Sequence, residues 1–141
     1  METIKIYLSG AMSSLDFEEQ SKWRQQIQDA VKFNYECEKK ALFFNPVNYF
    51  NFKEVRHKSE YEVMEFDLNA LRNSDLVVVN FNDTKSLGTC AELAIAYEKK
   101  IPIVGINKDN KELHPWLECF CNRMCDSLKE AVEYIVDFYL N

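Results

Sequence analysis

The spacing of hydrophobic residues changes repeatedly along the chain between the period of a strand and that of a helix. Residues 3–9 (TIKIYLS) alternate and stop at Gly10, a pattern that predicts a strand followed by a loop. Residues 76–81 (LVVVNF) form a nearly continuous β-branched run, which is typical of a strand covered on both faces of a parallel sheet. Further strands are predicted at residues 41–44 and 101–106, and a short fifth strand within residues 118–125.

Between these strands the hydrophobic residues recur at helical spacing. A capping box at Asp16 and Glu19 opens the first predicted helix, which runs to about Tyr35, and a second capping box at Ser59 and Glu62 opens the next. The predicted inner stripe of the first helix is Trp23, Ile27, Ala30, Val31 and Asn34, and that of the second is Met64, Leu68 and Leu71. Two more helices are predicted at residues 89–100 and 127–140.

Strands that alternate with helices predict an α/β fold, in which right-handed crossovers place helices on both faces of a parallel sheet. Five strands favour the order 2-1-3-4-5, and 141 residues are enough for a single domain. Ligands of such a doubly wound sheet bind at the C-terminal strand ends where the strand order reverses, here between strands one and three. Residues 10–15 and 82–88 form the two loops at this switch point, so a substrate site is expected there.

Composition narrows the class of partner. The net charge is −6 and the lysines are spread along the chain, so no basic stripe is available to bind a nucleic-acid polymer. The apolar runs are far shorter than the roughly 20 residues of a membrane-spanning helix, and residues 1–5 carry no secretory signal. We therefore expect a cytoplasmic protein without a nucleic-acid polymer or a membrane as partner.

The cysteines and the missing motifs argue against metal and cofactor chemistry. Cys119, Cys121 and Cys125 follow the spacing C-x-C-x-x-x-C rather than the C-x-x-C pairs of zinc sites. Reduced thiols are the expected state, and metal or redox chemistry is the alternative. The chain also lacks the phosphate loop G-x-x-x-x-G-K-[ST], G-x-G-x-x-G, H-E-x-x-H and G-x-S-x-G. Neither a cofactor nor a metal ion is expected.

Glu92 is the leading candidate for chemistry. It lies near the start of the predicted helix that follows residues 76–81, where the helix dipole favours an ionised and therefore nucleophilic carboxylate. The structural alternative is a capping box formed by Thr89 and Glu92, in which the glutamate only bonds back to the helix start.

Asp67 and Tyr7 are the next candidates. Asp67 falls within the inner stripe of its predicted helix, and a buried acid needs either a partner or a function. Its structural alternative is a hydrogen bond from a loop or a pairing with Arg72. Tyr7 lies near the C-terminal end of the first strand, where its phenol could hold a carboxylate across the switch point or could simply pack in the core.

Three segments, IYLSGAMSS, EFDLNALRNSDLVVVNF and SLGTCAELAIAY, resemble in this order the nucleoside 2-deoxyribosyltransferase superfamily, which includes the 2'-deoxynucleoside 5'-phosphate N-hydrolases. The resemblance implies a flavodoxin-like sheet. It also implies that Glu92 attacks the anomeric carbon of the sugar, that Asp67 assists the departing base and that Tyr7 orients the nucleophile. With a second base as acceptor the enzyme would be a transferase, and with water it would be a hydrolase.

The two switch-point loops supply the candidate substrate-binding residues, whose hydroxyls and amides could hold a phosphate or a sugar hydroxyl or could be ordinary loop groups. Ser86 stands where the transferases often carry an acid and the monophosphate hydrolases carry serine, which favours a 5'-phosphate. The loop AMSSL lacks the phosphate-binding arginine of those hydrolases, which keeps a free nucleoside open. The candidates are Gly10, Met12, Ser13, Ser14, Ser86 and Gly88.

Members of the superfamily commonly complete each site with a loop from a neighbouring subunit. The matching residues are His114 and Trp116, which could cap a base or a sugar, although a tryptophan after proline often only packs. We therefore expect a homo-oligomer that binds a small nucleoside or nucleotide. A nucleotide-binding or sensing module without turnover is the rival from another class, and a flavin-type phosphate-binding domain is a third possibility suggested by the fold.

Overall fold

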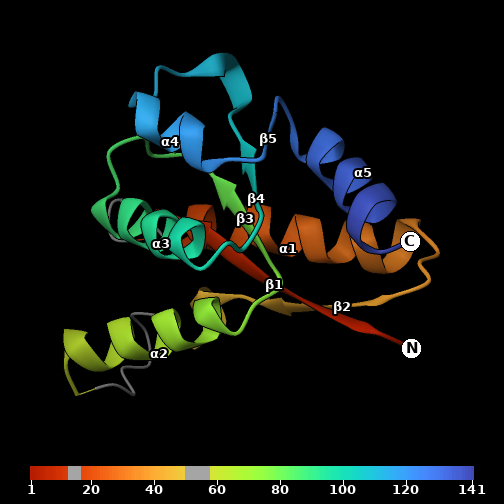
Figure 1. The fold of residues 1–141 in the computed structure, drawn as a ribbon, viewed down its shortest axis with the longest axis horizontal. Coiled ribbons are helices and arrows are strands. Elements are labelled where there is room, and N and C mark those ends of the chain that lie inside the picture. Colours follow the sequence, from red (N-terminus) through yellow and green to blue (C-terminus); the bar gives the residue numbers. More distant parts are fainter. Residues whose placement is uncertain (13–16, 50–57) are drawn as a thin grey trace.

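Five parallel strands form the centre of the molecule, which a computed structural model describes at residues 1–12, 17–49 and 58–141 (Figure 1). Hydrogen-bonded neighbours follow the order β2-β1-β3-β4-β5, and every neighbouring pair is parallel. This order confirms the predicted flavodoxin-like α/β sheet, with its switch point between β1 and β3. The strands are β1 (Thr3–Gly10), β2 (Lys40–Phe44), β3 (Leu76–Asn80), β4 (Ile103–Ile106) and β5 (Arg123–Cys125).

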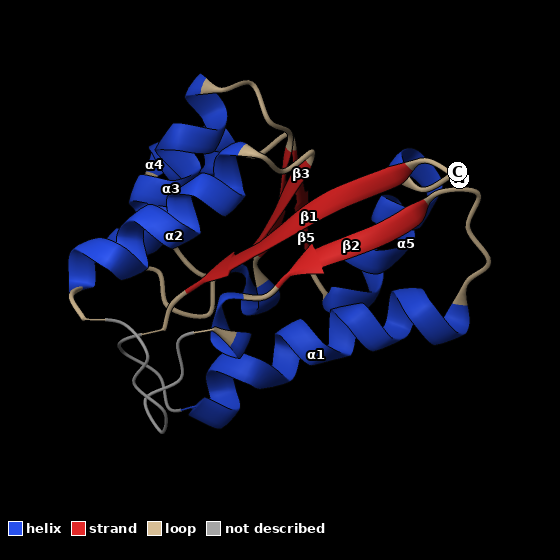
Figure 2. Cartoon of the chain, turned by 90° about the horizontal axis from the view of Figure 1, so that it is seen from below, coloured by secondary structure: helices blue, strands red, loops and turns tan. Residues whose placement is uncertain are grey.

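Helices cover both faces of this sheet. One face is covered by α1 and α5, and the other by α2, α3 and the short α4 (Figure 1). Figure 2 shows β1 and β2 side by side, with α1 on one side of them and α2 and α3 on the other. No helix within the described ranges is long and apolar enough to cross a membrane. The helices are α1 (Phe17–Asn34), α2 (Glu60–Arg72), α3 (Leu87–Glu98), α4 (Pro115–Phe120) and α5 (Leu128–Tyr139), with 3-10 turns at Pro46–Asn48 and Lys108–Asn110.

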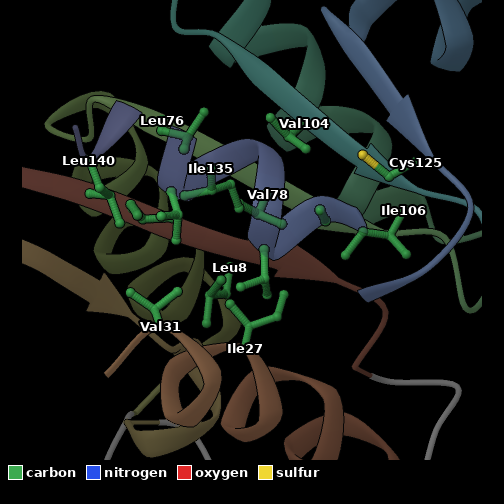
Figure 3. Close-up of a cluster of buried hydrophobic side chains, with 14 of the residues drawn as sticks. Leu8, Ile27, Val31, Leu76, Val78, Val104, Ile106, Cys125, Ile135 and Leu140 are labelled. Atoms are coloured by element: carbon green, nitrogen blue, oxygen red, sulfur yellow. The ribbon is translucent and has the colours of Figure 1, made fainter. Parts of the chain in front are cut away.

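The face beneath α1 and α5 holds a core of aliphatic side chains. Successive side chains of a strand point to opposite faces, so Leu8 of β1 faces this core whereas its neighbours face away. Figure 3 shows Leu8 beside Ile27 and Val31 of α1, with Val78 of β3 and Ile135 of α5 completing the layer. These side chains are almost fully excluded from solvent, so their burial supplies much of the stabilisation of the fold.

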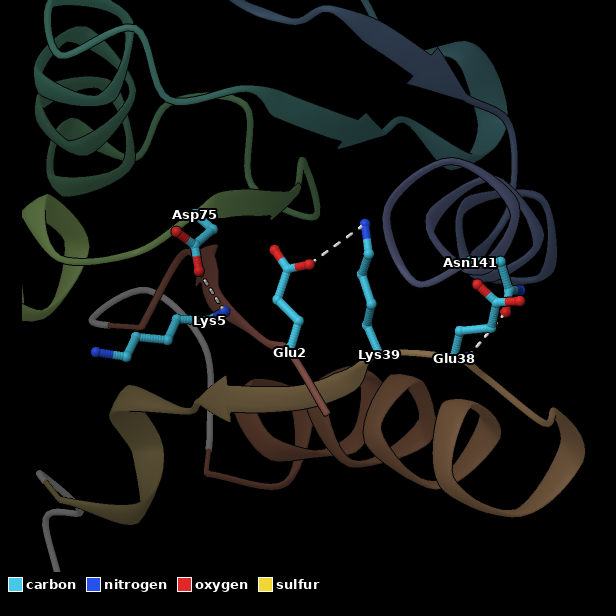
Figure 4. A network of polar contacts seen from close by, with 6 residues as sticks. All are labelled: Glu2, Lys5, Glu38, Lys39, Asp75 and Asn141. Atoms are coloured by element: carbon cyan, nitrogen blue, oxygen red, sulfur yellow. Dashed lines mark hydrogen bonds and ion pairs between the residues drawn. The ribbon is translucent and has the colours of Figure 1, made fainter.

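Polar contacts fasten the edge of the sheet at which the strands begin (Figure 4). The main-chain N–H of Lys5 donates to Oδ2 of Asp75 at 2.8 Å, and the N–H of Asp75 donates to the carbonyl of Lys5 at 2.8 Å. Nearby, Nζ of Lys39 lies 3.9 Å from Oε2 of Glu2. Asp75 therefore has a structural task where β3 begins, and the opposite edge is left for the switch-point loops.

The inner face of α2 differs from the predicted stripe. Met64 is 48% exposed rather than buried, and Leu71 is the helix's fully buried residue. Only the last turns of α2 reach the core, so the apolar pattern is not needed toward its start. Elsewhere the differences are small: Asn34 at the end of the α1 stripe is exposed, and the predicted cap Asp16 lies outside the described residues.

Candidate active site

Tyr7 and Glu92 are joined across the switch point of the sheet. The phenol of Tyr7 in β1 donates a hydrogen bond to Oε2 of Glu92 in α3. Ser9 points to the same side of β1 as Tyr7, and its hydroxyl donates to Oε1 of Glu92 at 3.2 Å. Tyr7 and Ser9 are fully buried, whereas the Glu92 side chain keeps part of its surface exposed. The carboxylate is thus held by two donors and remains accessible.

Glu92 does not cap its own helix. The N-cap of α3 is Ser86, whose Oγ accepts from the main-chain N–H of Thr89 at 3.4 Å and from the Thr89 hydroxyl at 2.9 Å. The helix therefore begins at Leu87, two residues before the predicted start, and Glu92 lies in its second turn. The capping-box interpretation of Thr89 and Glu92 is wrong, because an earlier serine already provides the cap.

Asp67 lies on α2 at the same corner of the molecule. It is partly buried, and its Oδ1 is enclosed without a hydrogen-bond partner among the described residues. The ion pairs within the described ranges do not include one between Asp67 and Arg72, so the local-pairing alternative is not what the structure shows. An enclosed carboxyl oxygen without a donor favours the protonated acid, or a ligand that supplies the missing hydrogen bond.

The two carboxyl groups differ in how well their surroundings stabilise the ionised form. Burial raises the pKa of Glu92 to about 7, against the lowering effects of the hydrogen bonds from Tyr7 and Ser9 and of the Arg24 charge. Burial, followed by the negative charge of Glu92, raises the pKa of Asp67 to about 7. Glu92 is the group that ionises first, because two donors stabilise its anion whereas Oδ1 of Asp67 has none. Near neutral pH the pair therefore holds one anion and one acid.

Tyr7 remains a hydrogen-bond donor throughout this range. Burial, followed by the negative charge of Glu92, raises the pKa of the Tyr7 phenol well above its ordinary value. Its ring also stacks on Phe44 of β2, with the ring centroids 5.3 Å apart. The raised pKa keeps the proton on the phenol, and the stacking holds the ring beside Glu92.

Two residues near Glu92 are absent from the sequence-based candidates, namely Ser9 and Arg24. Ser9 follows Tyr7 by two positions, so the alternation that places Tyr7 beside Glu92 also predicts Ser9 there. Arg24 is fully buried on α1, although an arginine in an amphipathic helix is ordinarily exposed. Its spacing of three residues from Ile27 and seven from Val31 puts it on the inner stripe, which is the signal that could have identified it.

An aromatic shelf extends from Tyr7 to the surface, formed by Phe44, Tyr49 and Phe66. Phe44 stacks on Tyr49 with centroids 5.0 Å apart, and Tyr49 lies 5.2 Å from Phe66. Tyr49 and Phe66 are 47% and 44% exposed. Through the ring of Tyr7 the shelf is connected to Glu92, and aromatic rings are groups on which a planar molecule can stack.

The loop after β1 contributes less defined candidates. Gly10 is the last residue of β1, and a Cβ there would stand 2.9 Å from the Trp23 ring, so its small size is explained by the packing of α1. The partly buried Met12 accepts a hydrogen bond from α1 through its carbonyl. Ser13 and Ser14 lie outside the described residues.

The remaining candidates lie on α3 and α4. Gly88 is exposed in the first turn of α3, and a Cβ there would meet nothing within 4 Å. His114 is the N-cap of α4, where its Nδ1 accepts from the main-chain N–H of Trp116 at 3.1 Å. Trp116 is 69% exposed, so its indole packs on little of this chain.

Metal-ligating side chains do not gather within the described ranges. No group of three or more histidine, cysteine, aspartate or glutamate side chains there could hold a metal ion. Cys119, Cys121 and Cys125 are free thiols, and burial raises the pKa of Cys121 to about 12.

Comparison with known proteins shows the family to which the chain belongs. A family-wide sequence profile described as "Nucleoside 2-deoxyribosyltransferase like" matches residues 3–110. The chain belongs to the nucleoside 2-deoxyribosyltransferase-like family. That match spans β1, α2 and α3, the elements that carry Tyr7, Asp67 and Glu92.

Solved structures show the same fold at low identity. A conserved protein from Enterococcus faecalis superposes with a TM-score of 0.73 at 19% identity, covering 94% of this chain and 97% of that one. A 2-deoxyribosyltransferase from Bacillus psychrosaccharolyticus gives 0.69 at 16% identity, covering 92% and 91%. A CMP N-glycosidase from Clostridium botulinum gives 0.62 at 15% identity, covering 96% and 99%. A search among curated proteins found no match.

Proposed function

We propose that this member of the nucleoside 2-deoxyribosyltransferase-like family cleaves the N-glycosidic bond of a deoxynucleoside or of its 5'-monophosphate, with Glu92 as the nucleophile. The observation that carries the proposal is the pair of hydrogen bonds from Tyr7 and Ser9 to the Glu92 carboxylate, together with Asp67, whose Oδ1 has no donor among the described residues. The proposal draws support from two relatives that share the fold, one named as a deoxyribosyltransferase and the other as a CMP N-glycosidase.

In the first step the ionised Glu92 attacks the anomeric carbon of the sugar. The bond between that carbon and the base nitrogen breaks, its electron pair leaves with the base, and protonated Asp67 gives its proton to the base. Tyr7 and Ser9 keep the carboxylate oriented toward the sugar. The product of this step is a glycosyl ester on Glu92 and a free neutral base.

In the second step an acceptor displaces Glu92 from the anomeric carbon. Asp67, now ionised, takes the proton that the acceptor loses, and both carboxyl groups return to their starting states. A second base as acceptor gives transfer, and water gives hydrolysis. Because the same two carboxyl groups serve both outcomes, access of water to the ester decides between them.

The aromatic shelf supports a nucleobase as the leaving group. The stacked rings of Phe44 and Tyr49 lead from Tyr7 toward the surface, and a planar heterocycle is the kind of group that stacks on aromatic rings. A non-catalytic nucleotide-binding module would need no donors on Glu92, and under that hypothesis Glu92 would serve as a helix cap. Ser86 holds that position instead.

The assembly is also part of the proposal. His114 and Trp116 are exposed at the start of α4, and in a homo-oligomer they would cover the sugar or base bound by a neighbouring subunit. Light scattering measures the oligomeric state, and Trp116→Ala should raise KM while leaving that state unchanged. A strictly monomeric protein with full activity would contradict this part.

A substrate panel tests the proposed reaction. The protein is incubated with purine and pyrimidine nucleosides, their deoxy forms and their 5'-monophosphates, each with and without a second free base, and base release and exchange are followed by chromatography. We expect release or exchange with deoxy substrates, and its loss in Glu92→Gln. Glu98→Gln removes an exposed carboxylate from the same helix and is the matched control. Binding of these ligands without any release would favour the nucleotide-binding module.

A further inference from the structure

Arg24 is a charged residue with no contact to water. Its exposed fraction is 0%, and it lies on α1 beneath the C-terminal end of β1. Its guanidinium donates to three main-chain carbonyls: Nε to Leu8 at 3.3 Å, Nη2 to Gly10 at 3.2 Å and Nη1 to Gln20 at 2.6 Å. Two of these acceptors belong to β1 and one to α1, so the side chain ties the helix to the strand.

The two carbonyls on β1 flank Ser9. Because side chains alternate along a strand, the chain segment that Arg24 holds from one face presents Ser9 and Tyr7 on the other. The indole of Trp23 closes the same side, with its ring centroid 4.7 Å from the guanidinium carbon of Arg24. Tyr7 and Ser9, which donate hydrogen bonds to Glu92, therefore belong to the segment of main chain that Arg24 holds in place.

A buried arginine is a costly way to pack a helix on a sheet. An aliphatic side chain would fill the same space without the desolvation of a charge. Burial lowers the pKa of Arg24 to about 10, which leaves it charged at neutral pH, and the negative charge of Glu92 is the largest effect that opposes this lowering. In the other direction, the charge of Arg24 lowers the pKa of Glu92, so each group favours the ionised form of the other.

We propose that Arg24 is a positioning residue of this site: it fixes the main chain on both sides of Ser9 and supplies the positive charge that stabilises ionised Glu92, without contacting the substrate. This inference rests on the proposed function, in which Glu92 must be an anion to attack. It assigns a catalytic purpose to a residue that makes no hydrogen bond to Glu92 itself among the described contacts.

Two substitutions separate the effect of the Arg24 charge from that of its hydrogen bonds to β1. Arg24→Met removes both, and Arg24→Lys keeps the charge but loses the forked contacts to Leu8 and Gly10. We expect Arg24→Met to lower kcat about tenfold or more, with little change in KM, because the nucleophile and not the substrate is disturbed. Lys22→Met is the control, since it removes an exposed charge from the same helix.

The pH profile distinguishes positioning from simple stability. Among the described residues, Tyr7 and Ser9 from β1 bond to Glu92, the charge of Arg24 from α1 acts on it through β1, and the charge of Glu92 acts on Asp67 from α2. Arg24→Met should move the acidic limb of kcat/KM upward by about one pH unit, while Arg24→Lys should leave that limb in place and lower kcat. A folded Arg24→Met protein with the wild-type kcat and the wild-type limb would overturn the proposal.

A measurement without turnover keeps this test independent of the proposed reaction. Carbon-detected NMR titration of the Glu92 carboxyl group gives its pKa in wild type and in Arg24→Met, and an upward shift supports the proposal whether or not the protein releases bases. If Arg24→Met does not fold, the cycle of Arg24→Lys, Ser9→Ala and the double variant decides. Coupling between the two changes supports positioning through Ser9, and additive effects on kcat overturn it. A wild-type protein inactive on every substrate would refute the proposed function and leave the NMR result standing.

Discussion

The phenol of Tyr7 donates a hydrogen bond to the carboxylate of Glu92, although 85 positions separate the two residues in the chain. The strand order brings them together, because β1 and β3 are neighbours and α3 follows β3 directly across the switch point. Such a bond from a buried phenol stabilises the carboxylate as an anion and fixes its orientation. A nucleophile needs both properties.

Removing the phenolic hydroxyl should impair the nucleophile selectively. Tyr7→Phe keeps the ring stacked on Phe44 but deletes a donor to Glu92, so the pKa of Glu92 should rise. We expect kcat/KM near pH 7 to fall by roughly tenfold to a hundredfold, and less at higher pH where Glu92 ionises anyway. Steady-state kinetics across pH measure this, with the exposed Tyr97→Phe as control. Equal losses at all pH values would argue against a role in ionisation.

The dependence of activity on pH should be bell-shaped. The pKa values of Glu92 and Asp67 are both raised to about 7, and catalysis requires Glu92 as the anion and Asp67 as the acid. We therefore expect the maximum of kcat/KM near neutral pH. Asp67→Asn should lower the rate about a hundredfold and flatten the alkaline limb, because the group that loses its proton there is gone.

The matched control for Asp67 is Glu65→Gln on the same helix, which removes an exposed carboxylate. Substrates whose bases depart readily without protonation should suffer less from Asp67→Asn than those that need an acid. An Asp67→Asn enzyme that retains the alkaline limb would show that another group titrates there.

Replacing Glu92 by a neutral isostere should stabilise the fold above neutral pH. The folded-state pKa of Glu92 is raised from 4.5 to about 7, so the folded protein binds more protons than the unfolded chain between these values and loses stability as pH rises through them. Glu92→Gln removes this loss. We expect Tm to rise by roughly 5 °C at pH 8 and to change little at pH 4, where the carboxyl is protonated in both states. Calorimetry at the two pH values decides, and an equal shift at both would contradict the buried-anion explanation.

Gly10 and Gly88 should respond to alanine in opposite ways. A Cβ at Gly10 would stand 2.9 Å from the buried ring of Trp23 and 3.4 Å from Nη2 of Arg24, so Gly10→Ala should cost about 1–3 kcal/mol of folding stability. A Cβ at Gly88 meets nothing within 4 Å in the first turn of α3, so Gly88→Ala should be neutral or slightly stabilising. Chemical denaturation measures both. A stable Gly10→Ala protein would show that α1 can move away from β1.

The sheet could be predicted because its signals are local. The β-branched composition of residues 76–81 predicts a central strand. The alternation after Thr3 predicts which side chains of β1 point toward α3. The stripe of α2 could not be predicted as well. Met64 has the right spacing, but the helix extends past the core at that end, and only the tertiary arrangement shows this.

The location of Glu92 and Asp67 near the switch point could be predicted, whereas their catalytic roles stay predictions and the residues that support them were missed. Ser86 and Thr89 are both suitable N-cap residues for α3, and the local sequence alone does not choose between them. The spacing of Arg24 marks it as an inner residue of its helix, but its partners are main-chain carbonyls, which no sequence motif identifies. Supporting contacts of this kind depend on how α1 lies on β1.

The most direct test of the central claim is to trap the glycosyl ester on Glu92. A 2'-fluorinated arabinonucleoside is suitable, because its fluorine destabilises positive charge at the anomeric carbon and slows breakdown of the ester. After acid quenching, intact-mass and peptide mass spectrometry locate the added pentosyl group. We predict one group per chain, on the peptide that contains Glu92, and none in Glu92→Gln. Base release by a wild-type protein that never carries the group, or a group attached to another residue, would contradict the assignment of Glu92 as the nucleophile.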